Sequence, residues 1–220
     1  MKRETKTNII LTALLFAVFA IFTVMVKTVD VAAIGPEGSK VGFASLNGMI
    51  RDGIGVHNFW YTLTKLLGAV AILIAAFFGV IGAMQLIKGK SLKAVEWDIY
   101  ALGITYVITI AFYALFEKLI INYRPIIKDA EEGLEASYPS SHTMLIIVVL
   151  GTALIEVGSR IRDEKIAMII KIALGVLIAV TVIGRLICGV HWFTDIVGGM
   201  ILGAALISLY LTLKGLSISK

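Results

Sequence analysis

The feature that most constrains this chain is a series of six apolar stretches, each close to the length that crosses a lipid bilayer. A helix needs about 20 apolar residues to cross a hydrocarbon layer of about 30 Å, and irregular backbone cannot face lipid. We therefore expect an all-α, polytopic membrane protein, with one domain (1–220) of six transmembrane helices in an antiparallel bundle. The expected spans cover residues 8–26, 60–87, 99–121, 142–158, 166–187 and 193–213.

The charges of the loops predict how these spans are oriented. The net charge is +5, yet the basic residues lie in short loops rather than in a patch suited to nucleic acid. Cytoplasmic loops are enriched in Lys and Arg, so we expect a multi-pass protein of the cell membrane with both termini in the cytoplasm. The basic residues of that side are Lys2, Arg3, Lys6, Lys88, Lys90, Lys93, Arg160, Arg162, Lys165, Lys214 and Lys220, and the other side has Lys27, Lys40, Arg51 and Lys128 outside the clusters described below.

Several features have ordinary structural interpretations. The first apolar run is longer than the about 7–15 residues of a signal peptide, which favours a retained anchor. In the long loop 27–58, His57 is expected to be solvated, although it could cover a substrate entrance, and Lys65 is expected to extend to the membrane interface. Gly199 and Gly203 form a GxxxG pattern that can mark close helix packing. Solvation is favoured over binding of a divalent ion for the acidic loop residues Asp129, Glu131, Glu132 and Glu135.

Three short polar clusters interrupt the apolar chain, at residues 118–125 (KLIINYRP), 138–142 (YPSSH) and 185–195 (RLICGVHWFTD). Charge placed against hydrocarbon is unfavourable, so such residues in a membrane protein indicate function. The first cluster ends the third span, the second begins the fourth, and the third joins the fifth span to the sixth. In an antiparallel bundle all three reach the same face of the membrane, which the loop charges predict to be the extracytoplasmic face.

The residue types in the first two clusters suit a phosphate ester. The forked cation of Arg124, like that of Arg185 in the third cluster, can hold phosphate oxygens in pairs, and Lys118 adds a point charge. Ser140 is expected to cap the fourth span, whose first N–H groups then form an anion site. His142 lies on that turn, within reach to donate a proton to a bound phosphate ester.

In the third cluster, His191 and Asp195 are four residues apart and therefore on one face of a helix. We expect the carboxylate to hold one ring nitrogen as N–H, which leaves the other free as a nucleophile. The same two residues, with His142, could instead ligate a metal ion. The cations could also form the anion-binding gate of a lipid transporter or flippase. A purely structural role gives no reason for the cations to converge.

The ordered clusters resemble the type 2 phosphatidic acid phosphatase superfamily of integral membrane phosphatases. The signature of that family has three parts, K-x6-RP, PSGH and SR-x5-H-x3-D. This chain shows Arg124-Pro125, the run PSSH at 139–142, and Arg185-x5-His191-x3-Asp195. The resemblance spans residues 118–195 directly, and the six-span layout extends it to the whole chain.

Three positions depart from the signature. The lysine of the signature falls on Glu117, and Lys118 follows it by one residue, which rotates a helical side chain by about 100°. Lys118 thus needs an irregular turn to reach the phosphate. Ser141 replaces a glycine but still supplies a backbone N–H, and Gly184 replaces a serine and so removes a hydroxyl.

The resemblance implies that His191 attacks phosphorus to form a phosphohistidine, that Asp195 orients it, and that His142 protonates the leaving oxygen. It also implies that the phosphate oxygens are bound and stabilised by Arg124, Arg185, Lys118, Ser140 and Ser141. No metal or other cofactor and no obligate protein partner are expected. The expected substrate is a membrane lipid phosphate or diphosphate, with undecaprenyl pyrophosphate favoured over phosphatidylglycerophosphate or phosphatidic acid.

Overall fold

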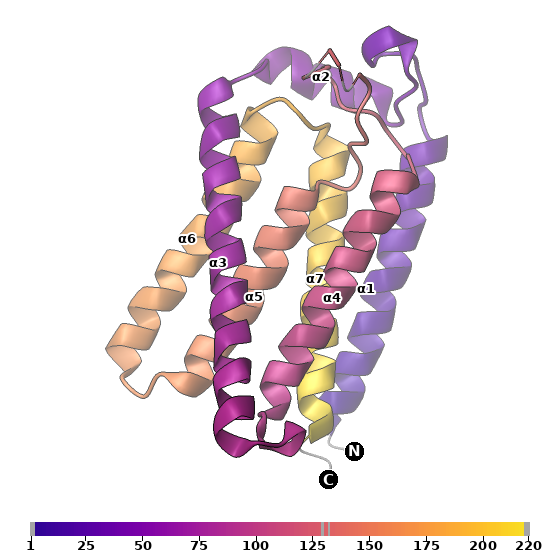
Figure 1. Cartoon of the computed structure of the whole chain (residues 1–220). Helices are drawn as coiled ribbons and strands as arrows, with labels where there is room; N and C mark the ends of the chain where they lie inside the picture. The colour runs from indigo at the N-terminus through magenta and orange to yellow at the C-terminus, as the bar shows by residue number, and fades with distance from the viewer. Residues whose placement is uncertain (1–2, 129, 132, 218–220) are drawn as a thin grey trace.

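The computed structural model describes residues 3–128, 130–131 and 133–217, in which the regular elements are helices apart from two isolated β-bridges. Six long helices run side by side, and the short helix α2 (Ala44–Ile54) lies across one end of the bundle (Figure 1). The other elements are α1 (Arg3–Thr28), η1 (Pro36–Gly38), α3 (Asn58–Gly89), η2 (Leu92–Ala94), α4 (Trp97–Lys118), α5 (Ser141–Arg160), α6 (Glu164–Ile187) and α7 (Phe193–Ser217).

All six long helices are long and apolar enough to cross a membrane. Their outward surface is apolar as well, since Ile10, Leu73 and Ile169 are 60%, 69% and 67% exposed. Such a continuous apolar surface is unfavourable in water and favourable in lipid. The prediction of an all-α membrane protein with six spans is confirmed.

The segment 27–58, expected as a loop, contains the helix α2. The helix is short and includes Gly48 and Gly53, so it shows no membrane-spanning pattern. Its buried Asn47 donates to Oγ1 of Thr194 at 3.0 Å and accepts from the Thr194 N–H at 3.2 Å. These bonds fix α2 to the first turn of α7, where one N–H group would otherwise have no helical partner.

The central helices of the bundle are α5 and α7. In each of them 56% of the most apolar stretch is buried, compared with 17% to 28% in the other spans. A Cβ at Gly199 would lie 2.8 Å from the backbone oxygen of Ser140, and one at Gly203 would lie 2.7 Å from Cγ2 of Ile147. The GxxxG pattern therefore marks close packing of α7 against α5 within this chain, which sets the start of one helix beside the start of the other.

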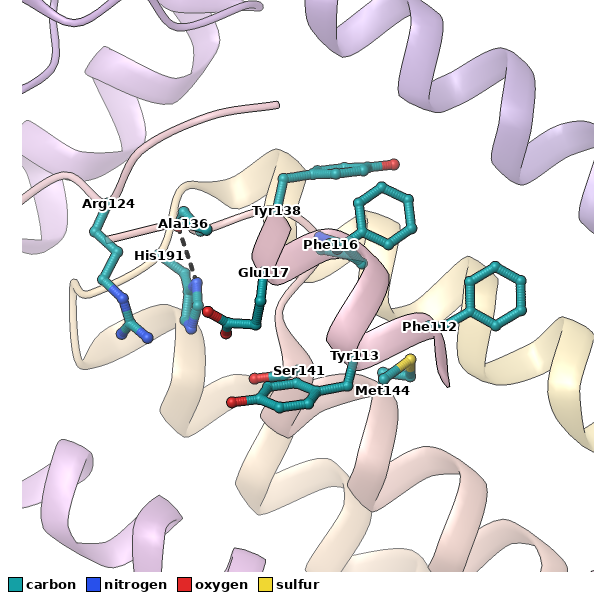
Figure 2. A pocket seen from close by; sticks show the side chains of 12 residues that line it. Phe112, Tyr113, Phe116, Glu117, Arg124, Ala136, Tyr138, Ser141, Met144 and His191 are labelled. Carbon is teal, nitrogen blue, oxygen red and sulfur yellow. Dashed lines mark hydrogen bonds between the residues drawn. The ribbon is translucent and has the colours of Figure 1, made fainter. Parts of the chain in front are cut away.

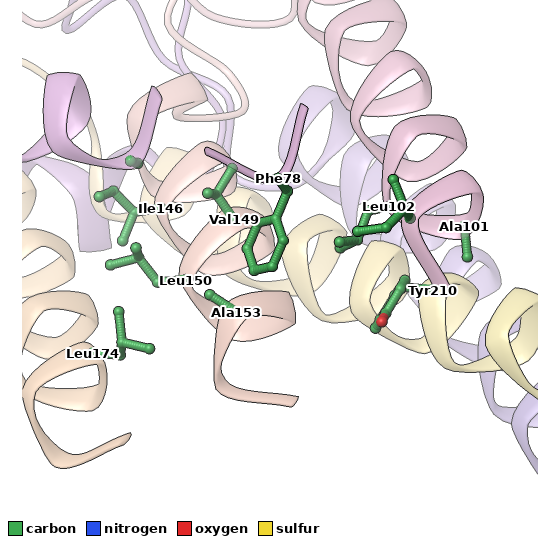
Figure 3. Packing of buried hydrophobic residues seen from close by; sticks show 11 residues of the cluster. Phe78, Ala101, Leu102, Ile146, Val149, Leu150, Ala153, Leu174 and Tyr210 are labelled. Carbon is green, nitrogen blue, oxygen red and sulfur yellow. The ribbon is translucent and has the colours of Figure 1, made fainter. Parts of the chain in front are cut away.

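A continuous apolar core fills the middle of the bundle (Figure 3). It takes one large side chain or more from each of five helices, including Phe78, Leu102, Leu150, Leu174 and Tyr210. Burial of these side chains removes apolar surface from contact with the surroundings and fixes how the helices are rotated. That rotation decides which polar side chains meet at the end of the bundle next to α2.

The opposite end of the bundle holds a buried ionic network around Glu156 of α5. The Glu156 carboxylate is fully buried and accepts from Nε of Arg160 and Nζ of Lys214, each at 2.6 Å, and from the Tyr210 hydroxyl. Lys214 also pairs with Asp98 of α4 at 2.9 Å. A buried charge is tolerated when it is paired in this way, so the network ties α4, α5 and α7 together far from the three clusters.

Candidate active site

The three clusters meet at the end of the bundle that carries α2. Arg124 in the loop after α4, Ser141 in the first turn of α5, and His191 between α6 and α7 line one pocket. Figure 2 shows these side chains around that pocket together with Glu117 of α4. Residues far apart in the sequence are therefore placed where they can act on one ligand.

His191 and Asp195 do not form the direct hydrogen bond that their spacing predicted. Nδ1 of His191 lies 3.8 Å from Oδ2 of Asp195, because α7 begins at Phe193 and His191 precedes the helix. The hydroxyl of Ser137 lies between them, 3.1 Å from Nδ1, and donates to Oδ2 at 2.5 Å. A hydroxyl has one proton, so Ser137 accepts from the Nδ1–H of His191, and Nε2 carries the lone pair.

Asp195 also ties the three clusters to one another. Its Oδ2 accepts from the Trp192 N–H at 2.8 Å, and its Oδ1 accepts from Nδ2 of Asn122 at 3.3 Å. The backbone N–H of Ser140 donates to the backbone oxygen of Asp195 at 2.9 Å. A fully buried carboxylate is stable here because several donors hold it, and its position fixes that of Ser137.

The imidazole of His191 is 5% exposed, and its Nε2 makes no hydrogen bond with the described residues. Burial, followed by the positive charges of Arg185 and Arg124, lowers the pKa of His191 well below its ordinary value. The ring is therefore neutral near pH 7. A neutral imidazole whose Nε2 lone pair is not used in a hydrogen bond has the properties of a nucleophile.

Arg185 is fully buried near the end of α6. Its Nη1 donates to Oγ1 of Thr64 at 3.4 Å, whereas Nε and Nη2 have no hydrogen-bond partner among the described residues. The guanidinium carbon also lies 5.7 Å from the ring centre of Tyr61. A buried cation with unused N–H donors is suited to an anion that supplies oxygen acceptors.

Arg124 is held by the loop that it belongs to. Its backbone N–H donates to the backbone oxygen of Glu135 at 3.0 Å, and its Nε pairs with the Glu135 carboxylate at 2.8 Å. In the predicted acidic loop, Glu135 therefore orients an arginine of the site rather than being solvated. Asp129 and Glu132 of that loop lie outside the described residues.

Ser140 is the N-cap of α5, as predicted. Its Oγ accepts from the backbone N–H of Thr143 at 3.4 Å and from the Thr143 hydroxyl at 3.0 Å. Ser140 is fully buried, and its hydroxyl caps the helix. Ser141 is the serine that lines the pocket. His142 is not among the residues that line this pocket; it packs against α3, where a Cβ at Gly68 would lie 3.3 Å from its Cδ2.

Lys118 does not join the pocket. It is the last residue of α4 and is exposed, and the pocket is lined by Glu117 instead. The helix stays regular through Lys118, so the irregular turn needed to redirect this side chain is not formed. The predicted role of Lys118 in phosphate binding therefore has no support from its position.

The replacement of the signature serine by Gly184 has a steric reason. A Cβ at this position would lie 2.8 Å from Cγ2 of Thr64 and 2.8 Å from Cε3 of Trp60. Because α3 occupies that space, a serine would push α3 away from α6. Gly184 thus permits the contact between Thr64 and the neighbouring Arg185.

Sequence reasoning missed several residues that the site uses. Ser137 and Asn122 lie beside or within the polar clusters, so a search for uncharged polar residues next to the motifs could have found them. Thr64 and Asn47 have no such signal, because they are distant in sequence and only the helix packing brings them to Arg185 and α7.

Comparisons with known proteins agree with this arrangement. The family model of the PAP2 superfamily matches residues 99–217. A solved structure described as the first transmembrane PAP2 type phosphatidylglycerolphosphate phosphatase from Bacillus subtilis shares the fold, with a TM-score of 0.62 and 19% identity over 94% of this chain and 96% of that chain. No curated protein matched the chain. The family match includes all three clusters and more than half of the chain, which therefore belongs to the PAP2 superfamily and is a multi-pass membrane phosphatase.

Proposed function

We propose that this protein hydrolyses a membrane lipid phosphate or diphosphate through a phosphohistidine at His191 and releases inorganic phosphate. One observation carries the proposal: the unpartnered Nε2 of the buried His191 lies within electrostatic range of the buried Arg185, which has unused N–H donors. A buried nucleophile among fixed cations is what phosphoryl transfer requires.

In the first step, Nε2 of His191 attacks phosphorus and a P–N bond forms. Positive charge then develops on the imidazole. The hydrogen bonds from Nδ1–H to Ser137 and from Ser137 to Asp195 stabilise that charge and hold the reactive tautomer. Water later cleaves the P–N bond and releases inorganic phosphate.

The remaining groups act on the oxygens. Arg124, Arg185 and the free N–H groups at the start of α5 stabilise the three equatorial oxygens of the transferring phosphoryl group. His142 donates a proton to the leaving oxygen and later accepts one from the attacking water. These cations are fixed by the fold, so the charge is neutralised at the moment at which it develops.

The pocket suits a phosphate attached to a lipid. Its lining includes the apolar side chains of Phe112, Phe116 and Met144 beside the polar groups, in keeping with a tail that stays in the membrane. The loop charges support a site on the extracytoplasmic face of the cell membrane and termini in the cytoplasm. We favour undecaprenyl pyrophosphate as the substrate, and phosphatidylglycerophosphate, the substrate type named for the solved relative, is the alternative.

We further propose that the reaction needs no metal. The oxygens of Asp195 already accept hydrogen bonds from Ser137, Trp192 and Asn122, which makes this carboxylate a poor metal ligand. Arg124 and Arg185 supply the positive charge that a metal would provide. Purified enzyme should therefore keep its activity in EDTA and lose it to vanadate.

The decisive experiment is phosphate release by the purified protein from a panel of lipid phosphates and diphosphates, with and without EDTA. His191→Ala should abolish release while the melting temperature in detergent is retained. His57→Ala is the matched control, because His57 is exposed and bonds to the backbone oxygen of Ile54 at 2.8 Å. Binding of lipid phosphate without any release by the native protein would instead indicate a transporter or flippase.

A further inference from the structure

Two lysines outside the three clusters lie within electrostatic range of the proposed proton donor, His142. Arg185, Arg124, Lys128 and Lys65 all place positive charge within electrostatic range of His142. The family signature accounts for the two arginines and leaves the two lysines unexplained. Lys65 belongs to α3 and Lys128 to the loop after α4, so two separate elements deliver charge to the same place.

Tyr61 contacts two of these cations, Lys128 and Arg185. Nζ of Lys128 donates to the Tyr61 hydroxyl and lies 4.1 Å from the centre of its ring, and Arg185 lies against the same ring. A cation near an aromatic ring is held there by the electrons of the ring face. Lys65 follows Tyr61 by four residues on α3, so both side chains project from one face of that helix.

The same face of α3 also contacts the established part of the site. Thr64 accepts from Arg185, and Gly68 allows His142 to pack against the helix. Lys65 adjoins Thr64 and lies one turn from Gly68, at the exposed edge of this face. Its positive charge acts on both Tyr61 and His142.

The side of the site on which these lysines lie is informative. In phosphoryl transfer the nucleophile and the leaving group are roughly in line, on opposite sides of phosphorus. His142 marks the side of the leaving group. A lipid monophosphate releases a neutral alcohol there, which needs no cation, whereas a lipid diphosphate releases a lipid monophosphate with a charge of about −1.5 to −2.

We propose that Tyr61, Lys65 and Lys128 form a second phosphate subsite, which binds the phosphate attached to the lipid and makes lipid diphosphates the preferred substrate class. The inference rests on the proposed function above. Nε2 of His191 bonds to the terminal phosphorus while the bond from that phosphorus to the bridging oxygen breaks. The bridging oxygen leaves on the lipid monophosphate with a proton from His142, and water then cleaves the P–N bond and returns a proton to His142.

The test compares farnesyl diphosphate with farnesyl monophosphate, which share one tail, as substrates of the purified full-length protein. Lys65→Ala and Lys128→Ala should each lower kcat/KM for the diphosphate about tenfold, and leave that for the monophosphate within about threefold of the native value. Lys65→Arg and Lys128→Arg should keep the preference. The control is Lys40→Ala, because Lys40 is an exposed lysine of segment 27–58. This variant should leave kcat/KM unchanged for both substrates.

Three outcomes would overturn the proposal. Equal losses for the two substrates would mean that the lysines act on the reacting phosphate or on the fold, and melting temperatures in detergent separate these two cases. Unchanged activity for both substrates would mean that the lysines bind nothing. Failure of the native protein to release phosphate from either substrate would refute the proposed function itself, which distinguishes that failure from an error in the subsite alone.

Discussion

Removal of the Ser137 hydroxyl is the sharpest test of how His191 is activated. In the structure this one hydroxyl accepts from Nδ1 of His191 at 3.1 Å and donates to Asp195 at 2.5 Å. All three side chains are at least 95% buried, so water cannot easily replace it. Ser137→Ala leaves the imidazole 3.8 Å from the carboxylate, too far for a good hydrogen bond.

The size of the effect follows from the bonds that are lost. A hydrogen bond to a charged group contributes about 1.5–3 kcal/mol, which corresponds to a loss of about 10- to 150-fold in kcat. The KM should change little, because the Ser137 hydroxyl is occupied by His191 and Asp195 rather than by the phosphate. Formation of the phosphohistidine, followed by rapid quench with a labelled substrate, should slow by the same factor as kcat.

A matched variant shows whether the effect is specific. Ser208→Ala removes another buried serine hydroxyl, which bonds to Thr12 at 2.8 Å far from the pocket, and should leave kcat unchanged. Folded Ser137→Ala protein with a kcat within about twofold of the native value would refute the reasoning. In that case His191 must be activated without the bridge to Asp195.

Three further predictions concern the same site. Lys118→Ala should keep nearly full phosphate release, whereas Arg124→Ala should lose most of it; an equal loss in both would show that Lys118 reaches the phosphate. Gly184→Ser should lower the free energy of unfolding by about 1–3 kcal/mol, because its Cβ would lie 2.8 Å from Thr64, and an unchanged melting temperature would contradict this overlap. The neutral form of His191 is the nucleophile, and its pKa is lowered. In a plot of kcat/KM against pH, the loss of activity on the acid side should therefore have its midpoint below pH 6.5. A midpoint above that value would count against His191 as the nucleophile.

The number of spans and the meeting of the clusters could be predicted from the sequence. A length of about 20 apolar residues is a direct requirement of the bilayer, and it is visible without any knowledge of packing. The order of the clusters along antiparallel helices then fixes which end of the bundle each one reaches. Arg124, Ser141 and His191 line one pocket for that reason.

The contacts between side chains could not be predicted in the same way. The i,i+4 spacing of His191 and Asp195 implied a direct bond, but α7 begins after His191 and the loop from α4 inserts Ser137 between them. Loop 119–140 has no periodic pattern from which its path could be inferred. A regular α4 likewise leaves Lys118 exposed and turns Glu117 to the pocket.

The sequence by itself thus determined the membrane-spanning class of the chain, its family signature, and the end of the bundle at which the chemistry lies. Only the tertiary structure decided which side chains meet there: Ser137 beside His191, Thr64 beside Arg185, and Lys128 beside Tyr61. The physical reason is that hydrophobicity and spacing report local requirements, whereas contacts between distant residues depend on how helices rotate against one another and on the path of the loops.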